Sequence, residues 1–339
     1  MKKSSRVFIF LLLALCLLTV LPKSADAAKY LIRAATVLID ESPTAKCLFM
    51  FRDIVESQTW GDVEVQVFTG GKLGDERPNI EAIQLNNIQV ATPSVGVLAN
   101  FSNEVRVINL PFLLTNQKVA FKVLEEDPIG KKILAGLSKI GIIGLGFTDY
   151  GMRNLTSKKK IKTLADLKGM KVRTMKVPDH LTLWKSLGAN PTPIAWSEVY
   201  TALQQGVVDG QENPFETIYL TKFYEVQKYI TVVGHIYDVQ PVIMSKKFYD
   251  SLPPNYQKIM YMAADIATKF NWYLTGEQNL MYKEQCEKAG MKVNYFSEAD
   301  MAKSRELNKP LFDQIRKVAG DALVNEYIAA VEKAKKELK

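Results

Sequence analysis

Two arginines lie where ends of β-strands are expected, and an arginine in such a place can bind an anion. Arg153 follows Gly151 after an apolar strand expected over 142–147, and Arg173 lies in a strand expected over 171–175. Ligands of open α/β sheets bind beyond the carboxyl ends of strands. A planar guanidinium donates two parallel hydrogen bonds to a carboxylate. Taken alone, an arginine is more often part of a structural or surface ion pair, so these residues only suggest a carboxylate site.

The sequence lacks the motifs of the common enzyme and metal-binding classes. Its two histidines, His180 and His235, have no partner at the spacing of metal ligands, and neither G-x-S-x-G nor C-x-x-C occurs. The glycines at 71 and 144–146 do not complete a phosphate-binding or dinucleotide-binding loop. A carboxylate pair for acid–base catalysis stays possible among the 36 acidic residues. Because none of these motifs is complete, we expect no enzyme, no cofactor and no metal site.

The first 27 residues have the features of an export signal. Basic residues precede the apolar run 7–21, and Ala25-Asp26-Ala27 places small residues where a signal peptidase cleaves. A membrane anchor is the alternative, but the run is shorter than the roughly 20 residues that usually span a bilayer. Leu15 before Cys16 disfavours a lipid-attachment site. We expect a signal peptide over 1–27 and cleavage near Ala27.

Charge and cysteine content limit the partners of the mature chain. The formal net charge is +8, and removal of four basic residues and one acid with the signal leaves +5. This charge can attract anions, but it is too dispersed for nucleic acid, and the lysine run 158–160 is interpreted as a solvated turn. Cys47 and Cys286 could form one disulfide, although two buried thiols are at least as plausible.

Strands and helices alternate along the mature chain, which indicates an α/β fold of two similar lobes. Strands are expected at 30–36 and 63–68 around a helix at 44–58, and a strand followed by a helix recurs over 171–187. The length suits about two domains. Because no low-complexity linker separates them, we expect the chain to cross between the lobes more than once.

The stretch 255–289 predicts one long helix. It has no proline, a single glycine at 276, and apolar residues at helical spacing. A helix of about 33 residues would be about 50 Å long, which exceeds the width of one small domain. It must therefore run past one lobe and brace the other, unless Gly276 breaks it. Two more amphipathic helices are expected over 298–338.

Several motifs, read in order, resemble one known family. They are Gly169-Met170-Lys171-Val172-Arg173, Gly188-Ala189-Asn190-Pro191-Thr192-Pro193, the segment 197–204 beginning Ser-Glu-Val-Tyr, and Val208-Asp209-Gly210-Gln211-Glu212-Asn213-Pro214. Together with 71–77 and 110–112 they closely resemble the solute-binding proteins of tripartite ATP-independent periplasmic (TRAP) transporters, in the dicarboxylate-binding-subunit family. The resemblance covers nearly the whole mature chain and is densest over 151–214.

The resemblance implies a two-lobed periplasmic-binding-protein fold with the ligand in the cleft between the lobes. We expect lobe I to contain 28–150 plus about 239–278, and lobe II to contain 151–238 plus about 279–339. The long helix would brace both lobes. A hinge motion would then close them around the ligand.

The resemblance also implies roles for residues of lobe II. Arg173 would make the main salt bridge to a ligand carboxylate, and Arg153 would assist it. Asn213 would also reach the ligand. Trp196, directly before the Ser-Glu-Val-Tyr motif, would stack on the solute, with a place in the core as the alternative.

Residues of lobe I are expected to select the solute, and here the sequence offers only candidates. They are Asp75, Glu76, Thr92 and Ser94. The two acids could instead be a solvated helix start, where acids interact favourably with the helix dipole. Some sialic-acid binders have an acid in the loop that 92–94 would form, and this chain has none, which argues against sialic acid.

The implied function is periplasmic binding of a small organic carboxylate and its delivery to a TRAP permease driven by an ion gradient. The carboxylate could be a dicarboxylate, a sugar acid or an oxo acid. The mature chain is expected to be soluble and monomeric, without a nucleic-acid partner. A secreted enzyme acting on a carboxylate, or a ligand-sensing partner of a membrane receptor, are the alternatives.

Overall fold

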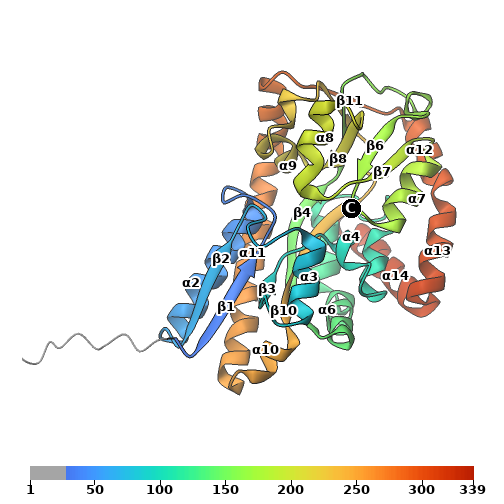
Figure 1. Cartoon of the computed structure of the whole chain (residues 1–339). Coiled ribbons are helices and arrows are strands. Elements are labelled where there is room, and N and C mark those ends of the chain that lie inside the picture. Colours follow the sequence, from blue (N-terminus) through green and yellow to red (C-terminus); the bar gives the residue numbers. More distant parts are fainter. Residues whose placement is uncertain (1–27) are drawn as a thin grey trace, which may run out of the picture.

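The computed structural model describes residues 28–339, which form two β-sheets surrounded by helices (Figure 1). The strand order is β2-β1-β3-β10-β4 in the first sheet and β11-β9-β5-β8-β6-β7 in the second. We call the parts of the molecule around these sheets lobe I and lobe II. The expected α/β class is confirmed, whereas the expected signal peptide, 1–27, lies outside the described residues.

The first sheet joins three parallel strands to two long antiparallel ones. Its strands are β1 (Tyr30–Ala35), β2 (Val63–Phe68), β3 (Val90–Ala91), β4 (Ile142–Met152) and β10 (Tyr237–Ser245). The helices of this part are α2 (Pro43–Gln58), α3 (Glu76–Gln84), α4 (Val95–Leu98), η1 (Glu104–Asn109), α5 (Gln117–Phe121), η2 (Lys122–Glu126), α6 (Pro128–Gly136), η3 (Leu137–Ile140) and α10 (Lys246–Ser251).

Strand β4 is longer than its sequence suggests. The apolar pattern ends near residue 147, yet the strand continues to Met152 because residues 148–152 pair with the start of β10. Thr148 and Asp149 in this extension are buried polar residues. Hydrophobic periodicity could not reveal this extension, because two of its buried positions are polar.

The second sheet is mixed and has six strands. They are β5 (Asn154–Ser157), β6 (Lys171–Thr174), β7 (Asn190–Pro193), β8 (Gly210–Asn213), β9 (Tyr229–Val232) and β11 (Lys292–Tyr295). The helices around it are η4 (Leu164–Leu167), α7 (Pro178–Ser186), η5 (Trp196–Glu198), α8 (Val199–Gln205), α9 (Phe215–Leu220) and η6 (Phe223–Glu225).

The chain crosses between the two sheets three times. Arg153 alone separates β4 from β5, and residues 233–236 lead from β9 back to β10. Helix α11 (Pro254–Lys288) makes the third crossing, contacting α2 and β4 in lobe I and α9 in lobe II (Figure 1). The expected long helix is therefore confirmed. Gly276 does not break it; a Cβ there would lie 2.5 Å from Oε1 of Gln117, so this glycine allows close packing.

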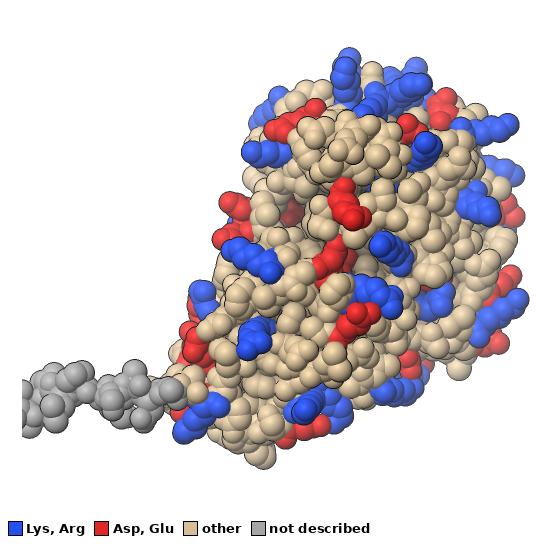
Figure 2. All heavy atoms as spheres, in the orientation of Figure 1, with Lys and Arg blue, Asp and Glu red and all other residues tan. Residues whose placement is uncertain are grey.

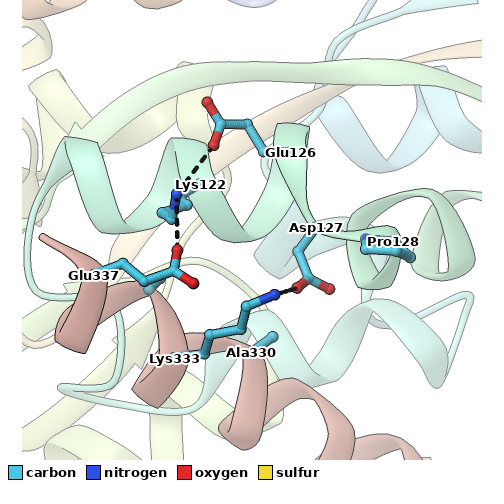
Figure 3. A pocket seen from close by; sticks show the side chains of 8 residues that line it. Lys122, Glu126, Asp127, Pro128, Ala330, Lys333 and Glu337 are labelled. Atoms are coloured by element: carbon cyan, nitrogen blue, oxygen red, sulfur yellow. Dashed lines mark hydrogen bonds and ion pairs between the residues drawn. The ribbon is translucent and has the colours of Figure 1, made fainter.

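The C-terminal region forms three helices where two were expected. They are α12 (Glu298–Leu307), α13 (Lys309–Ala319) and α14 (Asp321–Glu337). Helix α14 contacts α5 and α6 of lobe I. In Figure 3, Lys122 bridges Glu126 and Glu337, and Lys333 approaches Asp127. These contacts favour lobe I for α14, whereas the expected division gives 279–339 to lobe II, so the lobe boundaries stay a prediction.

The charged surface and the cysteines bear on the expected partners. Lysine and arginine are interspersed with acidic residues over the face shown in Figure 2, and the lysine run 158–160 is an exposed bend, as expected. Cys47 and Cys286 are buried and unpaired, so of the two alternatives the structure has the free thiols. Within 28–339, no helix is both long and apolar enough to cross a bilayer.

Small side chains let α11 lie close to lobe I, and this generates a stability prediction. Ala267 is fully buried where α11 packs on α2 and β4. We expect Ala267→Leu to lower the free energy of unfolding by about 1–3 kcal/mol through overpacking. Ile266→Leu, at a neighbouring position 45% exposed, is the control and should change it by less than about 0.5 kcal/mol. Urea denaturation measures both; equal stabilities would contradict this packing.

Candidate functional site

A cavity of about 240 Å³ lies between the lobes and receives residues from both. We call it the interlobe cavity. It is lined by Asp75, Glu76, Arg77, Pro78, Val97 and Asn100 from lobe I, and by Arg173, Met175, Lys176, Ile194, Ala195 and Trp196 from lobe II. Four of the eight predicted site residues are therefore together in one place: Arg173, Trp196, Asp75 and Glu76.

Arg173 is a buried cation without a counter-ion. Arg173 is 1% exposed, and its Nε and Nη2 donate to the carbonyl oxygen of Ile194 at 2.9 and 2.7 Å. Among residues 28–339 it forms no salt bridge, and Nη1 donates to no protein acceptor. Burial lowers the pKa of Arg173 to about 10, so it is charged at neutral pH. Because burying an unpaired charge is unfavourable, this position is suited to an anionic ligand.

The strands of lobe II determine where Arg173 points. It sits in β6 opposite Gln211 of β8 and Thr192 of β7, so its backbone is held on both sides. The carbonyl of Ile194, just beyond β7, fixes one edge of the guanidinium. The remaining N–H groups, on Nη1 and Nη2, form the end of the fork that can donate two parallel bonds to a carboxylate.

Trp196 lies between this cavity and the core, and its stacking on a solute stays a prediction. The guanidinium carbon of Arg173 lies 5.9 Å from the ring centroid of Trp196. On its other side the indole packs edge-on against Phe223, with ring centroids 6.0 Å apart. The ring is half-buried and lines the cavity. It therefore both supports the arginine and offers an apolar surface to a ligand.

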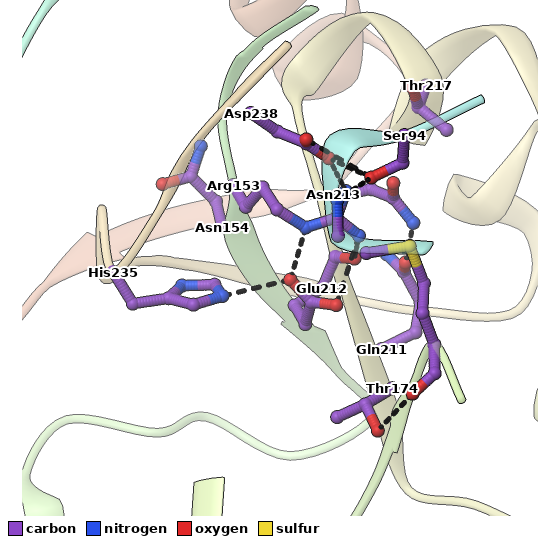
Figure 4. A network of polar contacts seen from close by, with 12 residues as sticks. Ser94, Arg153, Asn154, Thr174, Gln211, Glu212, Asn213, Thr217, His235 and Asp238 are labelled. Carbon is purple, nitrogen blue, oxygen red and sulfur yellow. Dashed lines mark hydrogen bonds and ion pairs between the residues drawn. The ribbon is translucent and has the colours of Figure 1, made fainter. Parts of the chain in front are cut away.

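Arg153 differs from Arg173 because the protein itself neutralises its charge. Its guanidinium forms ion pairs with Glu212 and, at 2.6 Å, with Asp238 (Figure 4). Nη2 also donates to the main-chain and side-chain oxygens of Glu212 at 2.7 and 3.0 Å. Burial alone would raise the pKa of Glu212, but Arg153 and His235 hold it well below its usual range. Arg153 does not line the interlobe cavity.

The ion pairs of Arg153 belong to a buried network at the crossings between the lobes. We define the hinge network as Arg153, Glu212, His235, Asp238 and Ser94 (Figure 4). His235 Nε2 lies 2.9 Å from Glu212, and Ser94 Oγ donates to both oxygens of Asp238 at 3.0 and 3.1 Å. The network thus joins β8, both strand crossings and the start of α4. Sequence motifs contain Glu212, but no pattern indicated Asp238 or His235.

The other candidates in lobe I have different surroundings. Glu76 is buried, accepts from the Ser94 amide at 2.7 Å, and has its pKa raised to about 7 by burial. Asp75 caps α3 and also accepts from the amide and hydroxyl of Ser197 in lobe II, at 3.3 and 3.4 Å. The Thr92 hydroxyl is buried without a hydrogen-bond partner among the described residues. Thr92 does not line the cavity.

Asn213 is the last residue of β8, and Glu216 lies in the first turn of α9. Asn213 is buried, and its amide donates to Oε1 of Gln211 at 2.6 Å; it does not line the interlobe cavity. Both carboxylate oxygens of Glu216 are buried without a partner among the described residues. Burial, together with the charge of Asp149, raises the pKa of Glu216 to about 8. Glu216 is therefore largely protonated at neutral pH.

Comparison with known proteins identifies the family. Residues 34–318 match the model described as bacterial extracellular solute-binding protein, family 7. The chain belongs to this family. The resemblance drawn from the sequence motifs is thus confirmed, and so is solute binding for transport as the class of function.

Two of the solved relatives of this family 7 protein hold a carboxylate. A solute-binding protein of Verminephrobacter eiseniae is 36% identical over 281 residues, which cover 83% of each chain. The sugar acid binding protein of Advenella mimigardefordensis, in complex with galactonate, is 34% identical with a TM-score of 0.87, covering 91% of this chain and 100% of that one. A TRAP periplasmic solute binding protein of Shewanella oneidensis with bound succinate is 27% identical with a TM-score of 0.84, covering 89% and 99%.

The contrast between the two arginines of this family 7 protein predicts opposite effects on stability. Arg153→Ala leaves Glu212 and Asp238 buried without their cation, so it should lower the free energy of unfolding by about 3–5 kcal/mol. Arg173→Ala removes an unpaired buried charge and should not destabilise the ligand-free protein. Denaturant titration of both variants without ligand measures this. Equal stability of Arg153→Ala and wild type would contradict the structural role of Arg153.

The buried acid Glu216 predicts a pH dependence of stability. Its pKa is raised from 4.5 to about 8 on folding, so between these values the folded chain holds a proton that the unfolded chain has released. Stability from this group is therefore present at low pH and is lost as pH rises through this window. Glu216→Gln cannot ionise, so the variant should gain stability relative to wild type from pH 5 to pH 8.5.

Thermal unfolding of both proteins without ligand, across this pH range, tests that prediction. Glu64→Gln, at an exposed position of β2, is the control and should follow the wild-type pH profile. A constant stability difference between Glu216→Gln and wild type at all pH values would show that Glu216 keeps an ordinary pKa.

Proposed function

We propose that the chain binds a small organic carboxylate in the interlobe cavity and delivers it to the membrane subunits of a TRAP transporter. The observation that carries this proposal is the buried Arg173, which lacks a counter-ion among the described residues while Arg153 has two. Charge-assisted hydrogen bonds in a site from which water is removed contribute about 1.5–3 kcal/mol each. The galactonate and succinate held by two relatives are both carboxylates.

The wall contributed by lobe I supports a ligand that also carries hydroxyl groups. Asp75 and Glu76 line the cavity together with Arg173. Carboxylates accept hydrogen bonds from hydroxyl groups and repel a second anion. The cations Arg77 and Lys176 also line the cavity, but both are on its exposed side, and Arg77 pairs with Glu81 at 3.1 Å. Sugar acids fit this distribution of charge better than dicarboxylates do.

Closure of the lobes would link binding to delivery. The cavity is formed by both lobes, and Asp75 contacts Ser197 across it. A ligand that touches both lobes favours the closed state by its higher affinity for that state. We propose that the three crossings act as the hinge and that α11 bends or carries the motion. A permease would then recognise the closed form.

We further propose the cellular setting expected from the sequence. Residues 1–27 would direct export and be cleaved near Ala27, so the mature chain would act in the periplasm, where proteins of this family work. The solute would be bound and released without chemical change, and no nucleic acid would take part.

Removal of the Arg173 side chain tests the proposed function. Arg173→Ala should lose at least about tenfold in affinity, equivalent to 1.4 kcal/mol, because the carboxylate loses its fixed cation. Isothermal titration with galactonate and with succinate measures the affinities, and recovery of unchanged ligand tests the absence of catalysis. Arg52→Ala is the control, because Arg52 pairs with Asp53 and does not line the cavity. Wild-type affinity in a folded Arg173→Ala variant would refute the proposal.

A further inference from the structure

Helix α11 carries an unusual share of the exposed apolar surface. Six of the 14 large apolar side chains that are exposed among residues 28–339 belong to it. They are Tyr261, Met262, Ile266, Tyr273, Leu280 and Met281. The opposite face of the same helix is buried in the protein through residues such as Ala263, Ala267 and Asn271. Exposed apolar side chains that lie together on one helix can form an interaction surface.

Three of these side chains recur at one spacing along the helix. Ile266, Tyr273 and Leu280 are seven residues apart, and Tyr273 and Leu280 are 68% and 72% exposed. Since 3.6 residues make one turn, residues seven apart lie nearly above one another. Met262, four residues before Ile266, extends the row. We call these four side chains the α11 stripe. A straight row of this kind is suited to packing against another helix.

The charges beside the α11 stripe are arranged symmetrically around Tyr273. Lys269 lies four residues before it and Glu277 four residues after it. If two copies of α11 packed antiparallel about Tyr273, positions at equal distance from it would face each other. Ile266 would then face Leu280 of the other copy, and Lys269 would face Glu277. Glu277 is exposed and forms no ion pair among the described residues, so it is available to a partner. Lys269 pairs with Asp265 at 2.8 Å on the surface of its own helix, so Glu277 of the other copy would share Lys269 with that acid.

We propose that the α11 stripe binds a second copy of this chain, forming an antiparallel twofold dimer centred on Tyr273. Around Tyr273 the pattern matches itself in both apolar contacts and charge, as an isologous interface requires. Met262 would face the exposed Glu284, so the matching contacts run from Ile266 to Leu280. This replaces the monomer expected from the sequence. The surface lies on the side of α11 that faces away from the protein core, so the proposal is independent of the ligand chemistry.

The position of the stripe gives the dimer a consequence for binding. Helix α11 contacts both lobes, so pairing along it would attach a partner to the element that connects them. An antiparallel pair would place lobe I of one copy beside lobe II of the other. Dimerisation would also protect the exposed Tyr273 and Leu280 from non-specific association.

Sedimentation velocity of the exported protein, measured over a wide range of protein concentrations, tests the proposal. Wild type should show a reversible monomer–dimer equilibrium, and Leu280→Glu should abolish the dimer. Leu85→Glu is the matched control, because Leu85, directly after the end of α3, is 69% exposed; it should dimerise like wild type. Both positions are exposed, so neither variant should lose its fold, and circular dichroism checks this.

A charge exchange tests the antiparallel register itself. Lys269→Glu and Glu277→Lys should each weaken the dimer at least about tenfold in dissociation constant, and the double variant should restore it, because opposite charges again face each other. A wild-type protein that stays monomeric at all concentrations would overturn the proposal. So would a dimer insensitive to Leu280→Glu, or a stripe whose variants impair only delivery to the permease.

Discussion

An unpaired positive charge in the interior of the protein is the constraint on which the site depends. The guanidinium of Arg173 is held by one carbonyl oxygen and one aromatic ring, and neither neutralises it. Placing a charge in this way is unfavourable for folding. The arrangement is understandable if an anion completes it during function. The strands β6, β7 and β8 position this charge, and the half-buried Trp196 packs beside it. The acids of lobe I line the same cavity.

The two arginines that the sequence places together at one carboxylate site have different surroundings in the structure. Arg153 occupies the single-residue link between β4 and β5, so its side chain lies where the lobes meet. There Glu212 and Asp238 neutralise it, and Ser94 extends the network into lobe I. A closed ion network at a crossing can hold two lobes in register. An open cation in a cavity can recognise a ligand.

The sequence predicts the helices and most strands because their periodicity is strong. Helix α11 and strands β1 and β2 have clear apolar patterns, and the Arg173 motif locates the binding lobe. The extension of β4 to Met152 could not be predicted, because it begins with the buried polar residues Thr148 and Asp149. The C-terminal region divides at Gly320, whose backbone has φ of 88°, into one more helix than the pattern indicated.

The surroundings of the candidate residues could not be predicted, because long-range contacts produce them. Asp238 lies 85 residues after Arg153 in sequence, and no local pattern connects the two. The same holds for the contact of Asp75 with Ser197. Sequence motifs therefore indicated candidate residues, whereas their division between the interlobe cavity and the buried ion network became visible only in the fold.

A crystal structure of the protein with bound galactonate would test the central claim most directly. We expect the carboxylate of the ligand to accept hydrogen bonds at about 3 Å from Nη1 and Nη2 of Arg173, with the ion pairs of Arg153 to Glu212 and Asp238 intact. A carboxylate bound to Arg153 in place of Asp238, with Arg173 making no ligand contact, would contradict the account.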